Sequence, residues 1–574
     1  MNLINFSKAN CRNCYKCLRR CPVKAIQFKN EQAGIIEDRC IACGQCLIAC
    51  PQNARYIKSD IDITKSAIKS NKKVCASIAP SFAGAFEMEN SGQLVTALHM
   101  LGFDFVEETA IGAQKITSEY NEYIIRKRPE NIITTCCPSA NYLIEKYYPS
   151  LVKYMLPFVS PMLAHGKMMR YSYGMDSFIV FIGPCTAKKN EIIEFEHEGT
   201  IDAVLTFEEL SEWLDNEKID LKTLKPSDFE AKSNAEGRIY PIRGGVLQGI
   251  IDLKTPYAKI SVDGIENCME AFDELQSKKL SRVCIEANAC TGGCIKGPGM
   301  PKSAKNFYFQ TLKVKKYTSE NKKSLNEYKH DKDHIESSIS FSKLFSDMSI
   351  QRKKASEEEI SNILKTMGKF EPEDELNCGV CGYNTCREKA EAIYEGMAEV
   401  TMCLHYMRTR AESLTNTIFE NSPNIIIILN TDMTVKEFSP AAEAAFKINA
   451  KDIAGKPISS IIDDESFLSV KETGKDIIGK KIELKNESMF LLNVLYLKKQ
   501  NAVLVIMNDI TLDEKHKQEL KKVKENTLDA AQAVIDKQMR VAQEIASLLG
   551  ETTAETKVIL TKLKKIAEKE GRDV

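Results

Sequence analysis

The spacing of the cysteines limits most strongly what this chain can fold into. It has 20 cysteines among 574 residues, and most of them stand in tight groups. The N-terminus has no basic segment followed by an apolar core, so we expect no secretory signal and a cytoplasmic protein. Reducing cytosol disfavours disulfides, so grouped cysteines indicate metal. Thiolates select zinc or iron–sulfur clusters, and the spacing has to decide between them.

Two cysteine runs near the start share one spacing, C-x2-C-x2-C-x3-C-P. This is the bacterial ferredoxin run, in which the fourth cysteine binds the other cluster. We therefore assign one 4Fe–4S cluster to Cys11, Cys14, Cys17 and Cys50, and a second to Cys40, Cys43, Cys46 and Cys21. A pair of zinc knuckles is the alternative, but zinc sites need no duplicated triplet with a trailing Cys-Pro.

A second group of cysteines is dispersed over more of the chain. Its members are Cys136 and Cys137 in TTCCPS, Cys185 in GPCTAKKNE, and Cys290 and Cys294 in EANACTGGC. Their wide separation means that the fold, not the local sequence, must bring them together. Glycines beside the last pair would let the backbone approach a bulky inorganic centre.

These three stretches resemble, in order, the signature motifs of FeFe (diiron) hydrogenases: TSCCP, PCxxKxxE and ExMACxGGC. The resemblance covers about residues 1–345. It implies an H-cluster, a 4Fe–4S cubane joined through a cysteine to a diiron unit with CO, cyanide and a bridging dithiolate. By resemblance, the cubane ligands would be Cys137, Cys185, Cys290 and Cys294, and Cys294 would also bridge to the diiron unit. Lys188 would face an iron cyanide with Glu191 as its support, and Ala79, Pro80 and Ser81 would contact the diiron ligands.

The remaining thiol of the pair, Cys136, is by the same resemblance a proton relay. A thiol with a pKa near 8.5 holds a proton at neutral pH and can still release it. Glu119 and Glu122 fall where this family has an ExxE pair, and their spacing puts both on one helical face. Two solvated surface glutamates are the alternative.

Four positions depart from the family pattern: Ala140, Leu156, Gly183 and Asn288. Leu156 stands where the relay has a serine hydroxyl, and a leucine cannot pass a proton. We expect these positions to surround the diiron site and to give weaker turnover than that of the fast hydrogenases.

A third cysteine set follows the hydrogenase-like region. Cys378, Cys381, Cys386 and Cys403 have the spacing C-x2-C-x4-C-x16-C. The set resembles a small 4Fe–4S domain of electron-transfer complexes, with four thiolates around one zinc ion as the alternative. Cys75, Cys268 and Cys284 remain, and we interpret them as buried small hydrophobes.

The cysteines stop at about residue 414, and the pattern becomes β-rich. Two strands, helices and then three strands, ending in Asp509-Ile510-Thr511, resemble a PAS domain. An unrelated small α+β domain is the alternative. No His or Cys stands between His405 and His516, so we expect neither a histidine-bound haem nor a cysteinyl-flavin adduct there.

The tail is helical, with Val534, Val541 and Ile545 among apolar residues that step by three and four. This spacing favours a dimer seam or a partner-docking surface over a solvated helical hairpin. The tail is too short for a kinase or phosphatase domain, so such a signalling partner would act in trans.

The fold class we predict is a multidomain α+β chain of five parts. These are a two-cluster ferredoxin-like domain (1–62), an α/β H-cluster domain (63–345), a small helical 4Fe–4S domain (346–412), a PAS domain (413–513) and a helical tail (514–574). Polar residues 317–340 are predicted to be a surface excursion or linker. Lys+Arg and Asp+Glu both number 79, which favours neither nucleic acid nor a membrane surface as partner.

Three functions compete. The first is a hydrogen sensor that oxidises H2 and signals through the PAS domain and tail, the second a metabolic hydrogenase exchanging electrons with ferredoxin. The third is a non-catalytic iron–sulfur protein of assembly or electron transfer. Cys136 together with the Glu119–Glu122 pair argues against the third, because a carrier needs no proton relay. The PAS domain and the altered pocket favour the first over the second. Separate maturation proteins would insert the diiron unit.

Overall fold

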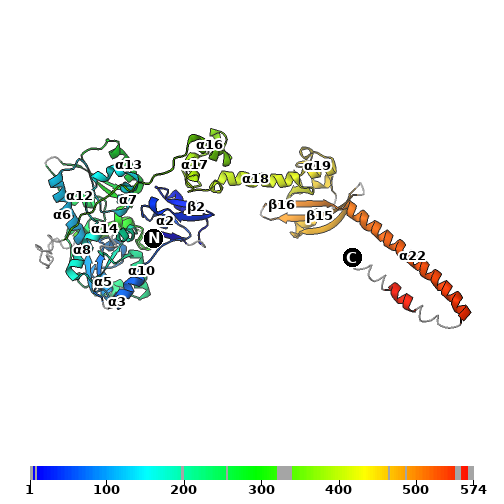
Figure 1. Ribbon diagram of the computed structural model, residues 1–574, viewed down its shortest axis with the longest axis horizontal. Helices are drawn as coiled ribbons and strands as arrows, with labels where there is room; N and C mark the ends of the chain where they lie inside the picture. Colours follow the sequence, from blue (N-terminus) through cyan, green and yellow to red (C-terminus); the bar gives the residue numbers. More distant parts are fainter. Residues whose placement is uncertain are drawn as a thin grey trace. The chain divides into compact units, whose positions relative to one another are not determined.

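The computed structural model describes residues 4–6, 10–70, 72–194, 199–253, 256–304, 306–319, 339–462, 466–484, 488–498, 500–549 and 558–565. The chain forms two compact units, Met1–Met407 and Arg408–Val574, and the elements of each can be followed in Figure 1. The boundary between them lies within helix α18 (Leu404–Asn421), as does the predicted boundary between residues 412 and 413.

The first region carries the two ferredoxin-type runs on a repeated strand–helix pattern. Strand β1 (Ile4–Phe6) pairs with β4 (Arg55–Ile57), and β2 (Ile26–Lys29) forms a hairpin with β3 (Gln32–Ile35). The short helices α1 (Lys16–Arg19) and α2 (Gln45–Ala49) contain Cys17 and Cys46. The two runs therefore have matching local structures.

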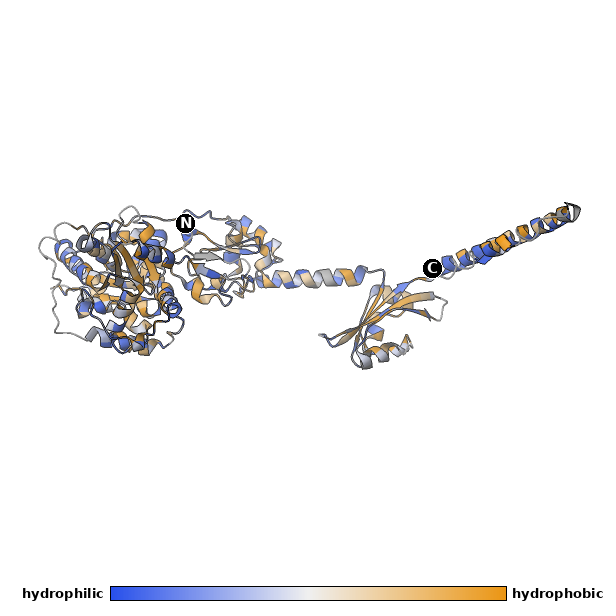
Figure 2. Cartoon of the chain, turned by 90° about the horizontal axis from the view of Figure 1, so that it is seen from below, coloured by the Kyte–Doolittle hydropathy of each residue, from blue (hydrophilic) through white to orange (hydrophobic). Residues whose placement is uncertain are grey.

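Two parallel sheets form the centre of the next region. One has the order β6-β5-β8-β9 and the other β10-β11-β7. Their strands are β5 (Val74–Ile78), β6 (Phe105–Glu108), β7 (Ile132–Ile133), β8 (Phe178–Gly183), β9 (Ala203–Thr206), β10 (Ala258–Asp263) and β11 (Val283–Asn288). Strand β5 is buried along its whole length, because parallel strands are covered on both faces. Figure 2 shows apolar residues on the strands of this region.

Helices connect and cover these strands. They are α3 (Ile61–Lys69), α4 (Phe82–Ala85), α5 (Gly92–Leu101), α6 (Ala110–Lys127), α7 (Pro138–Tyr147), α8 (Pro161–Tyr173), α9 (Ala187–Glu194), α10 (Phe207–Asn216), α11 (Ala235–Arg238), α12 (Gly245–Gly249), α13 (Ile265–Gln276) and α14 (Phe307–Ser319). Cys75, Cys268 and Cys284 are all buried, as predicted.

The predicted linker begins too early. Tyr317 and Thr318 belong to α14 and are buried. The Tyr317 ring packs edge-on against Phe82 and its hydroxyl donates to Glu108 at 2.6 Å. Composition suggested a solvated segment here, but this turn of the helix is amphipathic and its apolar face is buried. Residues 320–338 lie outside the described ranges.

The third cysteine set lies on a small helical region with α16 (Glu357–Thr366) and α17 (Cys386–Tyr394). It contacts the ferredoxin-like region directly. Arg39 forms an ion pair with Glu395 at 2.7 Å, and Arg19 Nη1 donates to the carbonyl of Val380 at 2.7 Å. Lys24 Nζ donates to the carbonyl of Gly382, also at 2.7 Å. These polar contacts hold the two cysteine-rich regions together.

The second unit contains a five-stranded antiparallel sheet of order β13-β12-β16-β15-β14. Its strands are β12 (Ile425–Asn430), β13 (Val435–Phe438), β14 (Ile477–Leu484), β15 (Ser488–Leu497) and β16 (Ala502–Asp509). Helices α19 (Pro440–Phe446), α20 (Ala450–Ile453) and α21 (Ser466–Thr473) come between the second and third strands. The predicted order of two strands, helices and three strands is confirmed.

Helix α22 (Thr511–Leu549) follows the last strand. Val534, Val541 and Ile545 are exposed on it, and Figure 2 shows apolar positions recurring along a largely polar helix. Among the described residues, no helix is both long and apolar enough to cross a bilayer.

Candidate functional site: a cysteine-lined cavity

A cavity lies where the carboxyl ends of the parallel strands meet. Ala79, Pro80 and Ser81 follow β5, Thr109 follows β6, and Cys185 follows β8. Other lining residues come from the segments after β7 and β11. Ligands bind outside the carboxyl ends of parallel strands, because loops rather than paired backbone stand there. The topology therefore builds the cavity from segments far apart in sequence.

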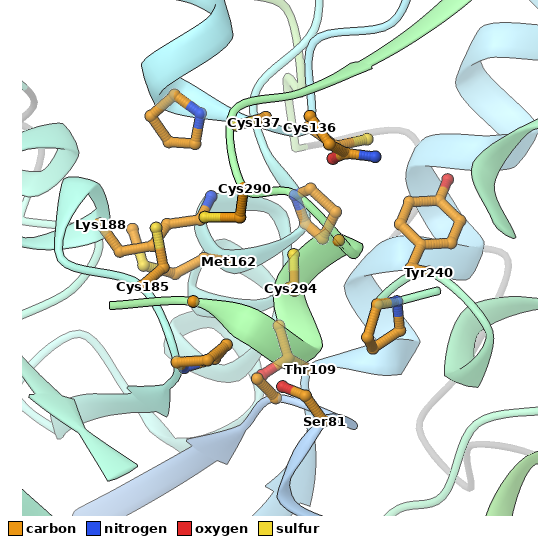
Figure 3. A pocket seen from close by; sticks show the side chains of 18 of the residues that line it. Ser81, Thr109, Cys136, Cys137, Met162, Cys185, Lys188, Tyr240, Cys290 and Cys294 are labelled. Atoms are coloured by element: carbon orange, nitrogen blue, oxygen red, sulfur yellow. The ribbon is translucent and has the colours of Figure 1, made fainter. Parts of the chain in front are cut away.

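The dispersed cysteines all line this cavity, as Figure 3 shows. They are Cys136, Cys137, Cys185, Cys290 and Cys294. The cavity and the solvent-open space at its mouth together contain about 930 Å³ free of protein atoms. A Cβ atom added at Gly293 would lie 2.5 Å from the carbonyl oxygen of Pro241, so glycine is needed for the close backbone packing beside Cys294.

Burial raises the pKa of the cavity thiols. The pKa of Cys185 is raised to about 11 and that of Cys136 to about 12, in both cases mainly by desolvation. The pKa of Cys290 is raised well above its ordinary value, by burial first and then by the neighbouring Cys185 and Cys137 thiols. Several thiolates could share this space only with positive charge among them, which bound iron would supply.

Lys188 brings a positive charge to the cavity wall. Its Nζ lies 2.8 Å from Glu191 Oε2, which also accepts a hydrogen bond from Ser160 Oγ at 3.0 Å. Both partners are buried, and Lys188 lines the cavity whereas Glu191 lies behind it. The carboxylate therefore positions the lysine and offsets the cost of burying its charge.

Ser81 has a buried side chain at the cavity wall. Among the residues that the structure describes, its hydroxyl has no hydrogen-bond partner. A buried hydroxyl without a partner is costly, and a group bound in the cavity could satisfy it. Ala79 and Pro80 line the cavity beside it.

Cys136 faces the cavity next to a buried tyrosine. The Tyr120 hydroxyl lies 3.4 Å from Cys136 Sγ and 3.0 Å from Thr135 Oγ1. Glu119 instead forms an ion pair with Lys115 at 3.1 Å, and Glu122 is exposed. The structure therefore brings Tyr120 to Cys136 and leaves both glutamates outside the set of residues that line the cavity.

Of the four departures from the family pattern, Asn288 lines the cavity. The expectation that all four surround it is too broad, since Ala140, Leu156 and Gly183 are not among the lining residues. A Cβ at Gly183 would lie 2.6 Å from the ring of Phe181, which itself lines the cavity. Phe181 therefore fills the space that a larger residue at position 183 would need.

The ferredoxin-like region reaches this cavity through Cys43, which is one of its lining residues. The pKa of Cys43 is raised well above its usual value by burial and next by the Cys21 thiol. Cys21 therefore lies close to the second cysteine run, as the crossed assignment requires. The guanidinium of Arg55 lies beside Cys17 and partly opposes the rise that burial causes in the pKa of that thiol.

The third cysteine set lines a smaller cavity, which together with the solvent-open space at its mouth has about 400 Å³ free of protein atoms. Cys378, Cys381, Cys386 and Cys403 all line it, together with the buried lysines Lys369 and Lys389. Burial lowers the pKa of Lys389, and its Nζ donates to the carbonyl of Val400 at 3.1 Å. Within the described ranges, no three His, Cys, Asp or Glu side chains are arranged to hold a single metal ion.

Several cavity residues were not predicted from the sequence. Thr109, Met162 and Tyr240 line the cavity, and the Tyr240 hydroxyl lies 2.7 Å from Thr117 Oγ1. None belongs to a cysteine motif. The position of Thr109 directly after a buried strand was the only available sign.

Three segments match known families. Residues 72–298 match the iron-only hydrogenase large subunit, C-terminal domain, and residues 3–75 match a 4Fe-4S dicluster domain. Residues 374–405 match a putative Fe-S cluster family. The chain is 27% identical to Iron hydrogenase 1 of Clostridium pasteurianum over 371 residues, which are 52% of this chain and 65% of that protein.

Two further similarities cover the same part of the chain. Protein NAR1 of Arabidopsis thaliana is 21% identical over 346 residues, 46% of this chain and 72% of that protein. A solved FeFe hydrogenase, HydA1 from Chlamydomonas reinhardtii, aligns at 18% identity with a TM-score of 0.38, over 45% of this chain and 88% of that one.

Three cysteine-rich segments with these matches define an iron–sulfur protein. More particularly, residues 72–298 resemble the iron-only hydrogenases, and the chain spans 65% of Iron hydrogenase 1 and 56% of the NADP-reducing hydrogenase subunit HndD of Solidesulfovibrio fructosivorans.

Proposed function

We propose that this protein is an FeFe hydrogenase that interconverts H2 with two protons and two electrons and acts as a sensor of H2 or redox state. The observation that carries the proposal is the convergence of five cysteines and Lys188 on one cavity. A site for iron–sulfur storage would need thiols, but it would not need a buried cation and a fifth thiol.

The residues around the cavity fit an H-cluster. Cys137, Cys185, Cys290 and Cys294 would hold the cubane, with Cys294 also toward the diiron unit. The buried, unpartnered Ser81 hydroxyl, together with Ala79 and Pro80, fits a wall that contacts polar ligands of that unit. When bound, the diiron unit supplies the site at which H2 is cleaved.

The protein's own residues would position charge and move protons. Lys188, held by Glu191, would stabilise negative charge on cyanide ligands. Cys136 would accept and return a proton at its Sγ atom. Turnover at neutral pH then requires a thiol that keeps its proton until an acceptor is available.

Electrons would leave through the cysteine-bound clusters. Cys43 borders both the cavity and the second ferredoxin-type run, and the third cysteine set contacts the ferredoxin-like region through Arg39–Glu395. Two 4Fe–4S clusters in the first region and one at Cys378, Cys381, Cys386 and Cys403 would form the chain. A ferredoxin or another redox protein would accept the electrons.

The sensory part of the proposal is supported by the second unit. Its sheet order β13-β12-β16-β15-β14, with helices after the second strand, is that expected of a PAS domain. The exposed apolar residues of α22 suit a homodimer seam or docking of a signalling protein such as a kinase or phosphatase. The redox state of the clusters would then bias what α22 binds.

Two alternatives remain distinct in their expected behaviour. A metabolic hydrogenase would turn over H2 with ferredoxin and bind no signalling protein. A non-catalytic iron–sulfur protein would bind the cubane alone. Because the chain is also similar to Protein NAR1, this second alternative is included in the test.

Infrared spectroscopy of the protein after co-expression with hydrogenase maturation proteins tests the catalytic proposal. We expect bands of iron-bound CO and CN in the wild type and their loss in Cys185→Ala. The wild type should be matured by components that load a known hydrogenase. If the bands are then absent, both the sensor and the metabolic hydrogenase functions are contradicted. For the sensor, pull-down of proteins by the full chain should differ between H2 and argon, and equal capture would leave a metabolic enzyme.

A further inference from the structure

A second line of polar side chains begins at the cavity wall, at Thr109. This residue follows β6, lines the cavity and is 5% exposed. In Figure 3 its side chain lies near Ser81, on the opposite side of the view from Cys136 and Cys137. Thr109 therefore gives the cavity a hydroxyl group away from the thiol pair.

Four consecutive hydrogen bonds lead from Thr109 through β5 and α8. Thr109 Oγ1 lies 2.7 Å from Ser77 Oγ, which lies 2.8 Å from His165 Nδ1. His165 Nε2 lies 2.9 Å from Glu107 Oε2, and the Tyr173 hydroxyl donates to Glu107 Oε1 at 2.5 Å. All four distances are within the range of good hydrogen bonds, so the line is unbroken.

The interior of this line is buried and its outer end is not. Ser77 and His165 are fully buried and Glu107 is 2% exposed, whereas Tyr173 is half-buried. Burying an imidazole and a carboxylate is costly unless each has hydrogen-bond partners. Here both ring nitrogens of His165 and both carboxylate oxygens of Glu107 have one. The line therefore runs from the cavity to a residue at the protein surface.

The hydrogen bonds around Cys136 end differently. Tyr120 is fully buried and contacts Thr135, whose hydroxyl donates to the main-chain carbonyl of Leu156 at 3.0 Å. A main-chain carbonyl accepts a hydrogen bond but has no proton to pass on. Within the described residues, these bonds lead from Cys136 to the backbone, so they leave open how protons reach solvent.

A neighbouring buried network serves as a structural comparison. Glu108, the next residue of β6, is held by Arg238 at 2.6 and 2.8 Å and by the Tyr317 hydroxyl at 2.6 Å. An arginine stays protonated, so this network can fix helices to the strand but cannot transfer protons through that residue. The Glu107 network instead contains a histidine, whose ring can accept a hydrogen bond at one nitrogen and donate one at the other.

We propose that a line of five side chains conducts one of the two protons of each H2 turnover between the cavity and the surface, whereas Cys136 carries the other. The line consists of Thr109, Ser77, His165, Glu107 and Tyr173. A proton that reaches Thr109 Oγ1 displaces the hydroxyl proton to Ser77 Oγ, and Ser77 passes its own to His165 Nδ1. His165 releases the Nε2 proton to Glu107 Oε2. The protonated Glu107 carboxyl group rotates to present this proton to the Tyr173 oxygen. The Tyr173 hydroxyl, which donates to Glu107 Oε1 at rest, turns and releases its own proton to water, so one proton enters and one leaves. Uptake follows the same steps in reverse.

This proposal rests on the proposed hydrogenase function, which supplies the protons. The test uses the full, matured chain in four forms: wild type, Ser77→Ala, Glu107→Gln and the control Glu108→Gln. Ser77 and Glu107 do not line the cavity, so cofactor loading should be equal in all four, as judged by the infrared bands of iron-bound CO and CN. The rate of H2 oxidation and its solvent deuterium isotope effect are then measured.

We expect Ser77→Ala and Glu107→Gln to lower the rate by about tenfold or more, within the range of lost proton transfer, and to raise the isotope effect. Glu108→Gln should lower the melting temperature but keep the rate and isotope effect of the folded protein. Infrared difference spectra between H2 and argon provide a readout apart from activity. They should contain a carboxyl signal in the wild type and Glu108→Gln that is absent from Glu107→Gln.

Equal rates, isotope effects and difference spectra in wild type, Ser77→Ala and Glu107→Gln would overturn the proposal while leaving the hydrogenase function intact. Equal losses of rate in Glu107→Gln and Glu108→Gln would also overturn it, because both networks would then be structural. A wild type without CO and CN bands would remove the hydrogenase function and this route with it.

Discussion

The hydroxyl of Tyr120 lies 3.4 Å from Cys136 Sγ and also accepts a hydrogen bond from the main-chain N–H of Thr135 at 3.0 Å. One buried phenol thus fixes both the cavity thiol and the backbone that precedes it. Tyr120 is fully buried, so any substitution at this position changes the packing of the protein interior.

Tyr120→Phe should lower the free energy of unfolding by about 1–3 kcal/mol, because the Thr135 N–H loses its buried acceptor. H2 turnover should fall several-fold as the Cys136 thiol loses its orientation. Urea unfolding and H2 uptake measure the two effects. Tyr123→Phe, on the same helix but outside the cavity lining, is the control. Equal stability and equal H2 uptake in the two variants would show that the contacts of the Tyr120 hydroxyl with Cys136 and Thr135 are unimportant.

Cys136→Ala should reduce H2 turnover by about 10²–10⁴-fold, the usual contribution of general acid–base catalysis. The infrared bands of iron-bound CO and CN should persist, because Cys136 is proposed to bind no iron. Cys284→Ala removes a buried thiol from β11 away from the cavity lining and should retain turnover. Full turnover in Cys136→Ala would eliminate the thiol as a proton carrier.

Glu191→Gln should destabilise the protein by about 3–5 kcal/mol, because it leaves the Lys188 ammonium buried without its counter-charge. The surface pair Lys232–Asp228, in which Asp228 is 90% exposed, is a matched control. Exposed ion pairs contribute little, so Asp228→Asn should change stability only slightly. Thermal unfolding of both variants without bound cofactor separates this effect from cluster loading, and similar losses would mean that the Lys188–Glu191 pair is no more important than a surface pair.

Lys389→Met should lower the reduction potential of the 4Fe–4S cluster that we propose at Cys378, Cys381, Cys386 and Cys403. A buried positive charge stabilises the more negative reduced state, and for one electron a change of about 59 mV corresponds to a tenfold change in the equilibrium constant. We expect a shift of tens of millivolts in an EPR-monitored titration. Lys365→Met, at an exposed position of α16, should leave the potential unchanged. An unaltered potential in Lys389→Met with the cluster loaded would contradict this role.

The fold was predictable where local pattern determines it. An isoleucine-rich stretch of six residues forms β12 and a valine-containing apolar stretch of eight forms β16. Ser439, directly before Pro440, caps α19 through its side chain. The segment at Tyr317 was misjudged because its charged neighbours hide one apolar face of the helix. Burial of that face depends on Phe82 and Glu108, which are more than 200 residues away.

The sequence by itself determined which residues can bind iron, because thiolate chemistry and the motif spacings are properties of the chain. Only the tertiary structure decided what surrounds them. Parallel strands end at one edge, so loops after β5, β6, β7, β8 and β11 meet there regardless of their separation. That convergence sets Tyr120 rather than Glu119 against Cys136, and joins Thr109 to Tyr173 through side chains that no local pattern connects. Contacts of this kind arise from packing in three dimensions, and residue spacing does not encode them.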